Sequence, residues 1–145
     1  MNNSAGFTLA ELVVTIVLVG IIAATAIPTF NNVVVSTQLQ INLSNMEIIK
    51  NAFVRYYYTT QMNFPTVPEN NLLDSEYKDL VLPDGRTPDN LFNGKDGLPY
   101  NSNGDPYSYY QENDTSSTGF VSRTIIIKDM NTDSPSYEEY VIGGI

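Results

Sequence analysis

The sequence predicts an α+β protein, in which one long N-terminal helix packs on a small antiparallel β-sheet. Three observations support this prediction. A nearly uncharged apolar segment follows a short polar leader, an apolar stripe at helical spacing comes next, and β-branched and aromatic residues are frequent near the C-terminus. A helix followed by a run of strands is typical of the α+β class. With 145 residues, the chain has the length of one domain plus one membrane helix.

The apolar segment from Phe7 to Ile27 has the length of a membrane-spanning helix. It would span roughly 31 Å at about 1.5 Å per residue, close to the roughly 30 Å hydrocarbon core of a bilayer. Glu11 is its one charged residue, and the next charge in the chain is Glu47. A carboxylate at mid-membrane costs about 2.5–3.5 kcal/mol, so it usually has a partner or a task. Because Glu11 lies near the end of the span, the alternative is that its carboxylate has no such task and only marks the helix boundary.

The helical pattern resumes after Pro28 and becomes amphipathic, so one helix from about Phe7 to Thr59 is predicted. Pro28 removes a backbone donor and is expected to kink this helix, and Gly20 is a second weak point. Apolar side chains share one face, which we expect to pack on a globular domain: Leu39, Leu43, Met46, Ile49, Phe53 and Tyr56. Polar side chains are expected mostly elsewhere around the helix: Asn42, Asn45, Glu47, Lys50 and Asn51.

The segment from Thr60 to Pro106 is rich in Pro, Gly, Asn and Asp, which favour turns. A short helix around Leu72 to Leu80 is the regular element expected within it. β-branched and aromatic residues then predict three strands, at Tyr107–Gln111, Phe120–Lys128 and Ser136–Ile142. The chain also has 10 tyrosines, whose rings we expect in the core and in subunit contacts rather than on an adhesive surface.

Composition excludes several functions. The net charge is −9, from 16 acidic and 7 basic residues, and phosphate binding needs a basic surface, so the globular part is not expected to bind nucleic acid. The chain has no Cys and no His, which removes disulfides, thiolate chemistry and the commonest general base. The sequence contains no nucleophile–base constellation and no Gly-rich phosphate loop, and we therefore do not expect an enzyme.

The beginning of the chain resembles a known family. Gly6, Phe7 and Glu11, followed by the apolar helix with Gly20 and Pro28, are similar to the N-terminus of type IV pilin-like proteins, which comprise type IV pilins and the pseudopilins of type II secretion. The resemblance implies that prepilin peptidase cleaves between Gly6 and Phe7 and that Phe7 is then N-methylated. It also implies that Glu11 neutralises the N-terminal amine of an adjacent subunit during assembly, and that the helix between Gly20 and Pro28 can unwind in the filament.

The pattern and the resemblance together divide the chain into four parts. These are a leader peptide at 1–6, a transmembrane and assembly helix at 7–28, the amphipathic half of that helix at 29–60, and a globular domain at 61–145. The resemblance implies an anchor in the bacterial inner membrane with the globular domain extracytoplasmic, then a periplasmic or surface filament. The implied partners are further copies of the chain, other pilin-like subunits, prepilin peptidase and the assembly machinery. Charge gives no orientation, because no Lys or Arg precedes Lys50.

Two short segments favour the pseudopilin branch of this family. Asn63–Thr66 resembles its Gly-x-Tyr-Pro-Thr signature, and Asn103–Tyr109 resembles the Gly-Asn-Pro-Tyr-x-Tyr segment of major pseudopilins. Major pseudopilins also resemble this chain in lacking the C-terminal disulfide of many pilins. Two alternatives stay open. One is a type IV pilus pilin for adhesion, motility or DNA uptake, and the other is a secreted binding module released by an ordinary signal peptidase after Ala24–Ala26.

The resemblance also raises the question of calcium, because major pseudopilins carry this ion in a loop. Calcium takes about six to eight oxygen ligands, and a turn-rich loop supplies carboxylates and amides at Asp89, Asn93, Asp96 and Asp105, with Asn101 and Asn103 beside them. A second acidic cluster comprises Asp129, Asp133, Glu138 and Glu139. The loop does not match the EF-hand spacing. The alternative for both clusters is a solvated acidic turn, in which Asp and Asn bond the backbone.

Overall fold

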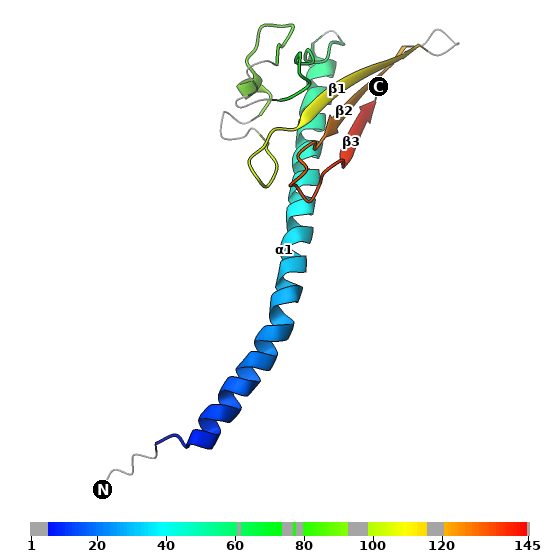
Figure 1. Ribbon diagram of the computed structural model, residues 1–145. Coiled ribbons are helices and arrows are strands. Elements are labelled where there is room, and N and C mark those ends of the chain that lie inside the picture. Colours follow the sequence, from blue (N-terminus) through cyan, green and yellow to red (C-terminus); the bar gives the residue numbers. More distant parts are fainter. Residues whose placement is uncertain are drawn as a thin grey trace. The chain divides into compact units, whose positions relative to one another are not determined.

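The computed structural model describes residues 6–60, 62–73, 77, 80–92, 99–115 and 121–144. Its elements are the helix α1 (Leu9–Thr59), the short 3-10 helix η2 (Pro88–Asn90), and the strands β1 (Ser108–Thr115), β2 (Val121–Lys128) and β3 (Tyr140–Gly144), as Figure 1 shows. The predicted α+β class, with a long helix on a small antiparallel sheet, is confirmed. The chain divides into two compact units, Met1–Thr37 and Gln38–Ile145.

The first unit consists mainly of the beginning of α1. Among the described residues, α1 is the one helix that is long and apolar enough to cross a membrane. It continues through Gly20 and Pro28 without a break. The hydroxyls of Thr25 and Thr29 donate to backbone carbonyls of the preceding turn, at 3.0 Å to Ile22 and 3.1 Å to Thr25. These polar side chains are therefore satisfied within the apolar segment.

The second unit contains the sheet, whose antiparallel strands lie in the order β1-β2-β3. Tyr109 lies opposite Ile127, and Ile125 lies opposite Gly143. The side chains of Tyr109, Ile125 and Ile127 are buried, and the ring of Tyr109 packs 4.8 Å from that of Phe53 in α1. Because side chains alternate along a strand, this face of the sheet covers the helix and the other face is more exposed.

The predicted third strand begins too early. β3 starts at Tyr140 rather than at Ser136, because the preceding residues form turns. The Ser136 hydroxyl donates to the Asp129 carboxylate at 2.6 Å. Glu138 has a left-handed backbone with a φ of 66°, which a regular strand does not contain. β1, in contrast, extends beyond its predicted end to Thr115.

The short helix predicted around Leu72 to Leu80 is wrong at its start. Leu72 forms an isolated antiparallel bridge with Ser108, at the beginning of β1. The Leu73 N–H donates to the Tyr107 carbonyl at 2.9 Å, which continues this pairing. Residues 74–76 and 78–79 of the predicted helix, like Phe120 of the predicted second strand, lie outside the described residues. The segment therefore begins with extended residues that pair with the start of β1.

The amphipathic stripe of α1 forms the helical side of the core, as predicted. Four of its six residues are buried and the other two are partly buried; the buried ones are Met46, Ile49, Phe53 and Tyr56. The prediction for Asn42 is wrong, because its side chain has no exposed surface and lies on the buried face of the helix. The core therefore contains a polar position that the apolar pattern does not reveal.

Tyrosines fill much of this core, as expected. Tyr77, Tyr107 and Tyr109 have no exposed surface. Their hydroxyls donate to backbone carbonyls, at 2.5 Å from Tyr77 to Pro99 and 2.9 Å from Tyr109 to Pro65. Burial raises the pKa of all three phenols above the ordinary value, so these groups stay protonated and act as donors. Tyrosine side chains thus satisfy loop carbonyls at the core boundary.

Gly143 permits the close approach of β3 to α1, and its replacement by alanine should be destabilising. An added Cβ would lie 2.9 Å from Lys50 Cγ and 3.1 Å from Ile125 Cγ1. We expect Gly143→Ala to lower the free energy of unfolding by about 1–3 kcal/mol, the usual cost of overpacking. Urea unfolding of the full chain in detergent, followed by near-UV circular dichroism of the buried tyrosines, measures this change.

Gly144→Ala is the matched control, since a Cβ at Gly144 would meet its nearest atom, Thr124 Oγ1, at 3.9 Å. We expect this variant to stay within about 0.5 kcal/mol of the unmodified chain. Equal stability of the two variants would contradict the close packing of β3 on α1.

Candidate assembly site on the N-terminal helix

Glu11 and Thr8 form a reciprocal pair of hydrogen bonds at the start of α1. The Thr8 N–H and hydroxyl donate to Glu11 Oε2 at 2.9 and 2.8 Å. In return, the Glu11 N–H donates to the Thr8 hydroxyl at 3.3 Å. This is a capping box, in which a threonine before the helix and a glutamate three residues later satisfy each other's backbone N–H groups. Glu11 therefore has a task within its own chain, which is to close the first turn of α1.

The capping box leaves part of the Glu11 carboxylate free. Both capping bonds end on Oε2, and within the described residues Oε1 accepts no hydrogen bond. An ionised carboxylate has about four acceptor sites, so a second donor can bind at the same time. Phe7, which would become the first residue after leader cleavage, is 88% exposed just outside this turn. The start of α1 thus presents an open carboxylate oxygen on Glu11 and an exposed Phe7 just before the helix.

The helix that follows exposes its apolar side chains on all sides. From Leu9 to Val35, its large hydrophobic residues are exposed, and among the described residues none is covered by the chain itself. A Cβ built at Gly20 would meet nothing within 4 Å, so this position is a flat spot that a neighbouring helix can approach. Pro28 lies within α1. Such an apolar surface needs lipid or other helices around it. The unwinding of the helix between Gly20 and Pro28 stays a prediction.

The calcium ligands predicted for the first loop fall only partly within the described residues. Asn93, Asp96 and the side chain of Asp89 lie outside them. Asp105 is described, and its carboxylate accepts a hydrogen bond from the Asn131 amide. Asn101 Oδ1 accepts the N–H groups of Asn103 and Asp105, at 3.0 and 2.8 Å. The described part of the loop therefore forms a turn whose side chains bond its own backbone.

The second acidic cluster is split between the core and the surface. Asp129 is fully buried and accepts hydrogen bonds from the hydroxyls of Ser134 and Ser136, both at 2.6 Å, and from the Asn131 N–H at 3.0 Å. The other three carboxylates are exposed: Asp133, Glu138 and Glu139. Within the described residues no three carboxylates are grouped to hold a metal ion. These hydrogen-bond donors, with the Asn101 amide, occupy both oxygens of the Asp129 carboxylate, so the arrangement does not fit a calcium ligand.

Asn42 joins α1 to two loops of the second unit. Its side-chain N–H groups donate to the hydroxyls of Ser136 at 2.8 Å and Ser134 at 3.0 Å, and its Oδ1 accepts the Ser102 N–H at 2.7 Å. Since the same serines bond Asp129, one buried polar network connects the helix, residues 101–105 and the β2–β3 loop. The polar character of Asn42 on an apolar helix face is the signal that could have indicated this network.

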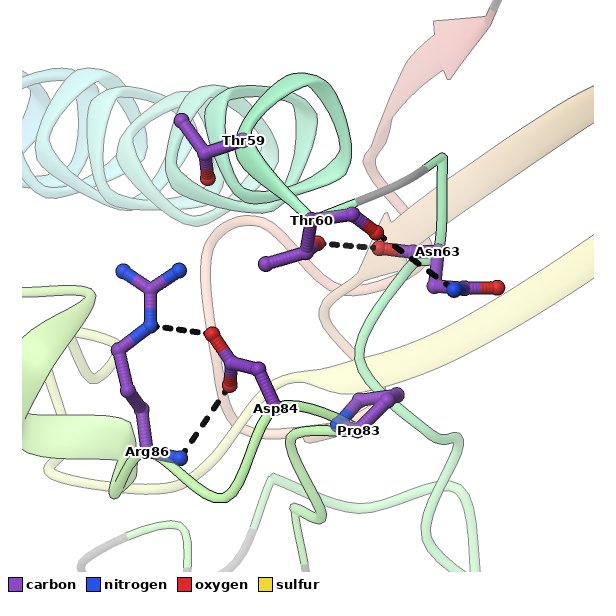
Figure 2. A pocket seen from close by; sticks show the side chains of 6 residues that line it. All are labelled: Thr59, Thr60, Asn63, Pro83, Asp84 and Arg86. Atoms are coloured by element: carbon purple, nitrogen blue, oxygen red, sulfur yellow. Dashed lines mark hydrogen bonds and ion pairs between the residues drawn. The ribbon is translucent and has the colours of Figure 1, made fainter.

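A polar pocket lies at the other end of the second unit, beside the last turn of α1 (Figure 2). Its volume is about 360 Å³, and it is lined by Thr59, Thr60, Asn63, Pro83, Asp84 and Arg86. Arg86 pairs with the Asp84 carboxylate, and its guanidinium carbon lies 5.3 Å from the centre of the Tyr56 ring. Burial acts to raise the pKa of the Asp84 carboxyl, but hydrogen bonds from Arg86 and Tyr56 outweigh it and hold this pKa below its usual range.

Comparison with known proteins agrees with the N-terminal geometry. Residues 1–27 match the family model described as the prokaryotic N-terminal methylation motif. No match was found among the curated proteins or among the solved structures. The matched segment contains the capping box, Gly20 and most of the apolar helix, and it does not distinguish pilins from pseudopilins. This motif, at the head of a long apolar helix joined to an α+β unit, marks the chain as a member of the type IV pilin-like family.

Proposed function

We propose that this protein is a structural subunit of a type IV pilin-like filament, processed by prepilin peptidase and assembled through α1. The observation that carries the proposal is the methylation motif on a helix whose apolar side chains are exposed on all sides. Before assembly, this helix would anchor the chain in the bacterial inner membrane with the globular part outside the cytoplasm. The role is structural and includes no catalytic step.

Glu11 would set the register of the filament. Cleavage between Gly6 and Phe7 would create an amine on Phe7, methylated but still charged, within the apolar core formed by the helices. A charge in such surroundings needs a partner, and the free Oε1 of a neighbour's Glu11 would supply it. Apolar packing between helices replaces contacts with lipid, so it supplies little directional preference. The amine–carboxylate pair would supply that preference.

Intact mass and N-terminal sequencing of the chain, from membranes of a host with prepilin peptidase, test this proposal. We expect a mature chain that begins with methylated Phe7. A chain beginning at Ile27 would instead indicate ordinary secretion after Ala24–Ala26, a segment that lies within α1. An unprocessed Met1 would indicate a plain membrane anchor and would also contradict the proposal.

Within this family we favour a pseudopilin of a type II secretion system. Asn103–Tyr109, the segment similar to that of major pseudopilins, forms the turn into β1. Gly104 has a φ of 85°, which favours glycine, and Tyr107 and Tyr109 are buried in the core. The second candidate is a type IV pilus pilin. Loss of protein secretion after deletion would support the first, and shear-released surface filaments containing this chain would support the second.

A further inference from the structure

The second unit presents a fixed cation and a group of free carboxylates at two different levels along α1. The Tyr56 hydroxyl donates to Asp84 Oδ1 at 2.9 Å, which ties the Arg86 loop to the last turns of the helix. Asn42 bonds Ser136 at 2.8 Å, which ties the β2–β3 loop to the beginning of the helix in this unit. A helix rises about 1.5 Å per residue, so residues 42 and 56 are roughly 21 Å apart. The two charged surfaces are therefore well separated on one subunit.

Asp84 and Tyr56 hold the Arg86 side chain in place, but part of its guanidinium has no hydrogen-bond partner among the described residues. Its Nε donates to Asp84 Oδ2, and its guanidinium lies against the Tyr56 ring. In the part of the chain that the structure describes, its two terminal nitrogens donate to no other group, and Figure 2 shows them directed away from Asp84. The side chain is 43% exposed. An arginine fork held in this way fits a second carboxylate, because little side-chain freedom is lost on binding.

The β2–β3 loop presents carboxylates from a rigid backbone. Asp133, Glu138 and Glu139 are exposed, and over the described ranges their side chains take part in no hydrogen bond or ion pair. Two backbone hydrogen bonds fix the loop, from the Asp129 N–H to the Glu139 carbonyl at 3.1 Å and from the Glu138 N–H to the Asp129 carbonyl at 2.8 Å. The left-handed backbone of Glu138 is unfavourable for a residue with a side chain, and such residues often lie at functional positions.

We propose that in the filament the β2–β3 loop docks on the pocket lined by Arg86 in the next copy of the chain. Glu138 would then pair with the terminal nitrogens of the Arg86 guanidinium. The inference rests on the proposed filament function. With a net charge of −9, copies of the chain repel each other, so a contact that brings carboxylates to a fixed cation is favoured over other contacts. Two different surfaces of one subunit that fit each other generate a head-to-tail series, as a filament requires.

Crosslinking in assembled filaments tests this contact. The chain has no cysteine, so Arg86→Cys and Glu138→Cys introduce the two thiols of the full chain. A short bismaleimide is the suitable reagent, because a direct disulfide needs Cα atoms within about 7 Å, less than an arginine–glutamate pair spans. We expect a ladder of covalent oligomers from the double variant and none from either single variant. The pair Arg86→Cys with Glu112→Cys, an exposed carboxylate on β1, should give no ladder.

Charge reversal is the second measurement. Arg86→Glu should lower the yield of sheared filaments several-fold, and adding Glu138→Arg and Glu139→Arg should restore it. Two outcomes would overturn the contact and leave the filament function intact. In the first, the double-cysteine variant forms filaments but gives no crosslinked ladder. In the second, the combined charge reversal does not restore the filament yield. If the unmodified chain forms no filaments in a host with the assembly machinery, the proposed function fails and this inference fails with it.

Discussion

Replacing Glu11 by alanine should abolish filament formation while the chain still inserts in the membrane. A pair of charges about 4 Å apart is worth on the order of 4 kcal/mol at an effective dielectric constant of about 20, or roughly a thousandfold in each subunit contact. Removal of the carboxylate also lowers the cost of insertion, so anchoring is not lost. Electron microscopy of sheared filaments and immunoblots of the membrane fraction measure the two effects. Normal filaments from Glu11→Ala would contradict the proposed role.

Two control variants separate the charge of Glu11 from its capping function. Glutamine also closes a capping box, so Glu11→Gln keeps the bonds to Thr8 and removes only the charge. We expect this variant to fail in assembly as alanine does. Thr8→Val keeps the carboxylate and removes the capping hydroxyl, which costs about 0.5–2 kcal/mol of local helix stability, and it should still assemble. Assembly of Glu11→Gln together with failure of Thr8→Val would show that capping, rather than the charge pair, is essential.

Asn42→Ala should destabilise the second unit. The variant leaves the part-buried Ser102 N–H without its acceptor and removes two donors from the buried serines around Asp129. An unsatisfied buried group costs about 1–3 kcal/mol, and a cavity adds to this cost. We therefore expect a decrease of about 3 kcal/mol in the free energy of unfolding, measured by urea unfolding of the full chain in detergent.

Asn51→Ala provides the control for this variant. Asn51 is exposed on the same helix, so the substitution removes the same atoms without burial, and alanine has the higher helix propensity. We expect a change of less than about 0.5 kcal/mol. If the two variants are equally stable, the buried network does not hold the helix against the loops.

The main elements of the fold could be predicted because they depend on local patterns. The spacing from Met46 to Tyr56 shows which helix face is buried, and β-branched residues indicate β2. Asn42 could not be assigned in the same way, since its partners lie 60 to 94 residues later. The end of the β2–β3 loop depends on Asp129, whose bonds draw Ser136 out of the predicted strand. Such long-range polar contacts follow from tertiary structure and leave no periodic signal.

The residues of the candidate site show the same difference between local sequence patterns and long-range contacts. Glu11 could be selected from the sequence, because a charge within an apolar helix is conspicuous, and Phe7 was implied by the resemblance to type IV pilin-like proteins. The capping box also has a sequence signal, a threonine three residues before a glutamate at a helix start, but this signal is less conspicuous than a charge in an apolar segment. The pocket around Arg86 was not visible, because Tyr56 and Asp84 meet only in the folded chain.

The position of the Asn42 network also has a mechanical consequence. In the proposed assembly, the subunit would be pulled from the bilayer through its own helix, and the covalent chain would carry that force into the globular unit. Asn42 lies near the first residues of that unit, and its bonds reach two separate loops. The load would therefore be shared between several hydrogen bonds at the point of entry, and these bonds would protect the tyrosine-filled core behind them from unravelling.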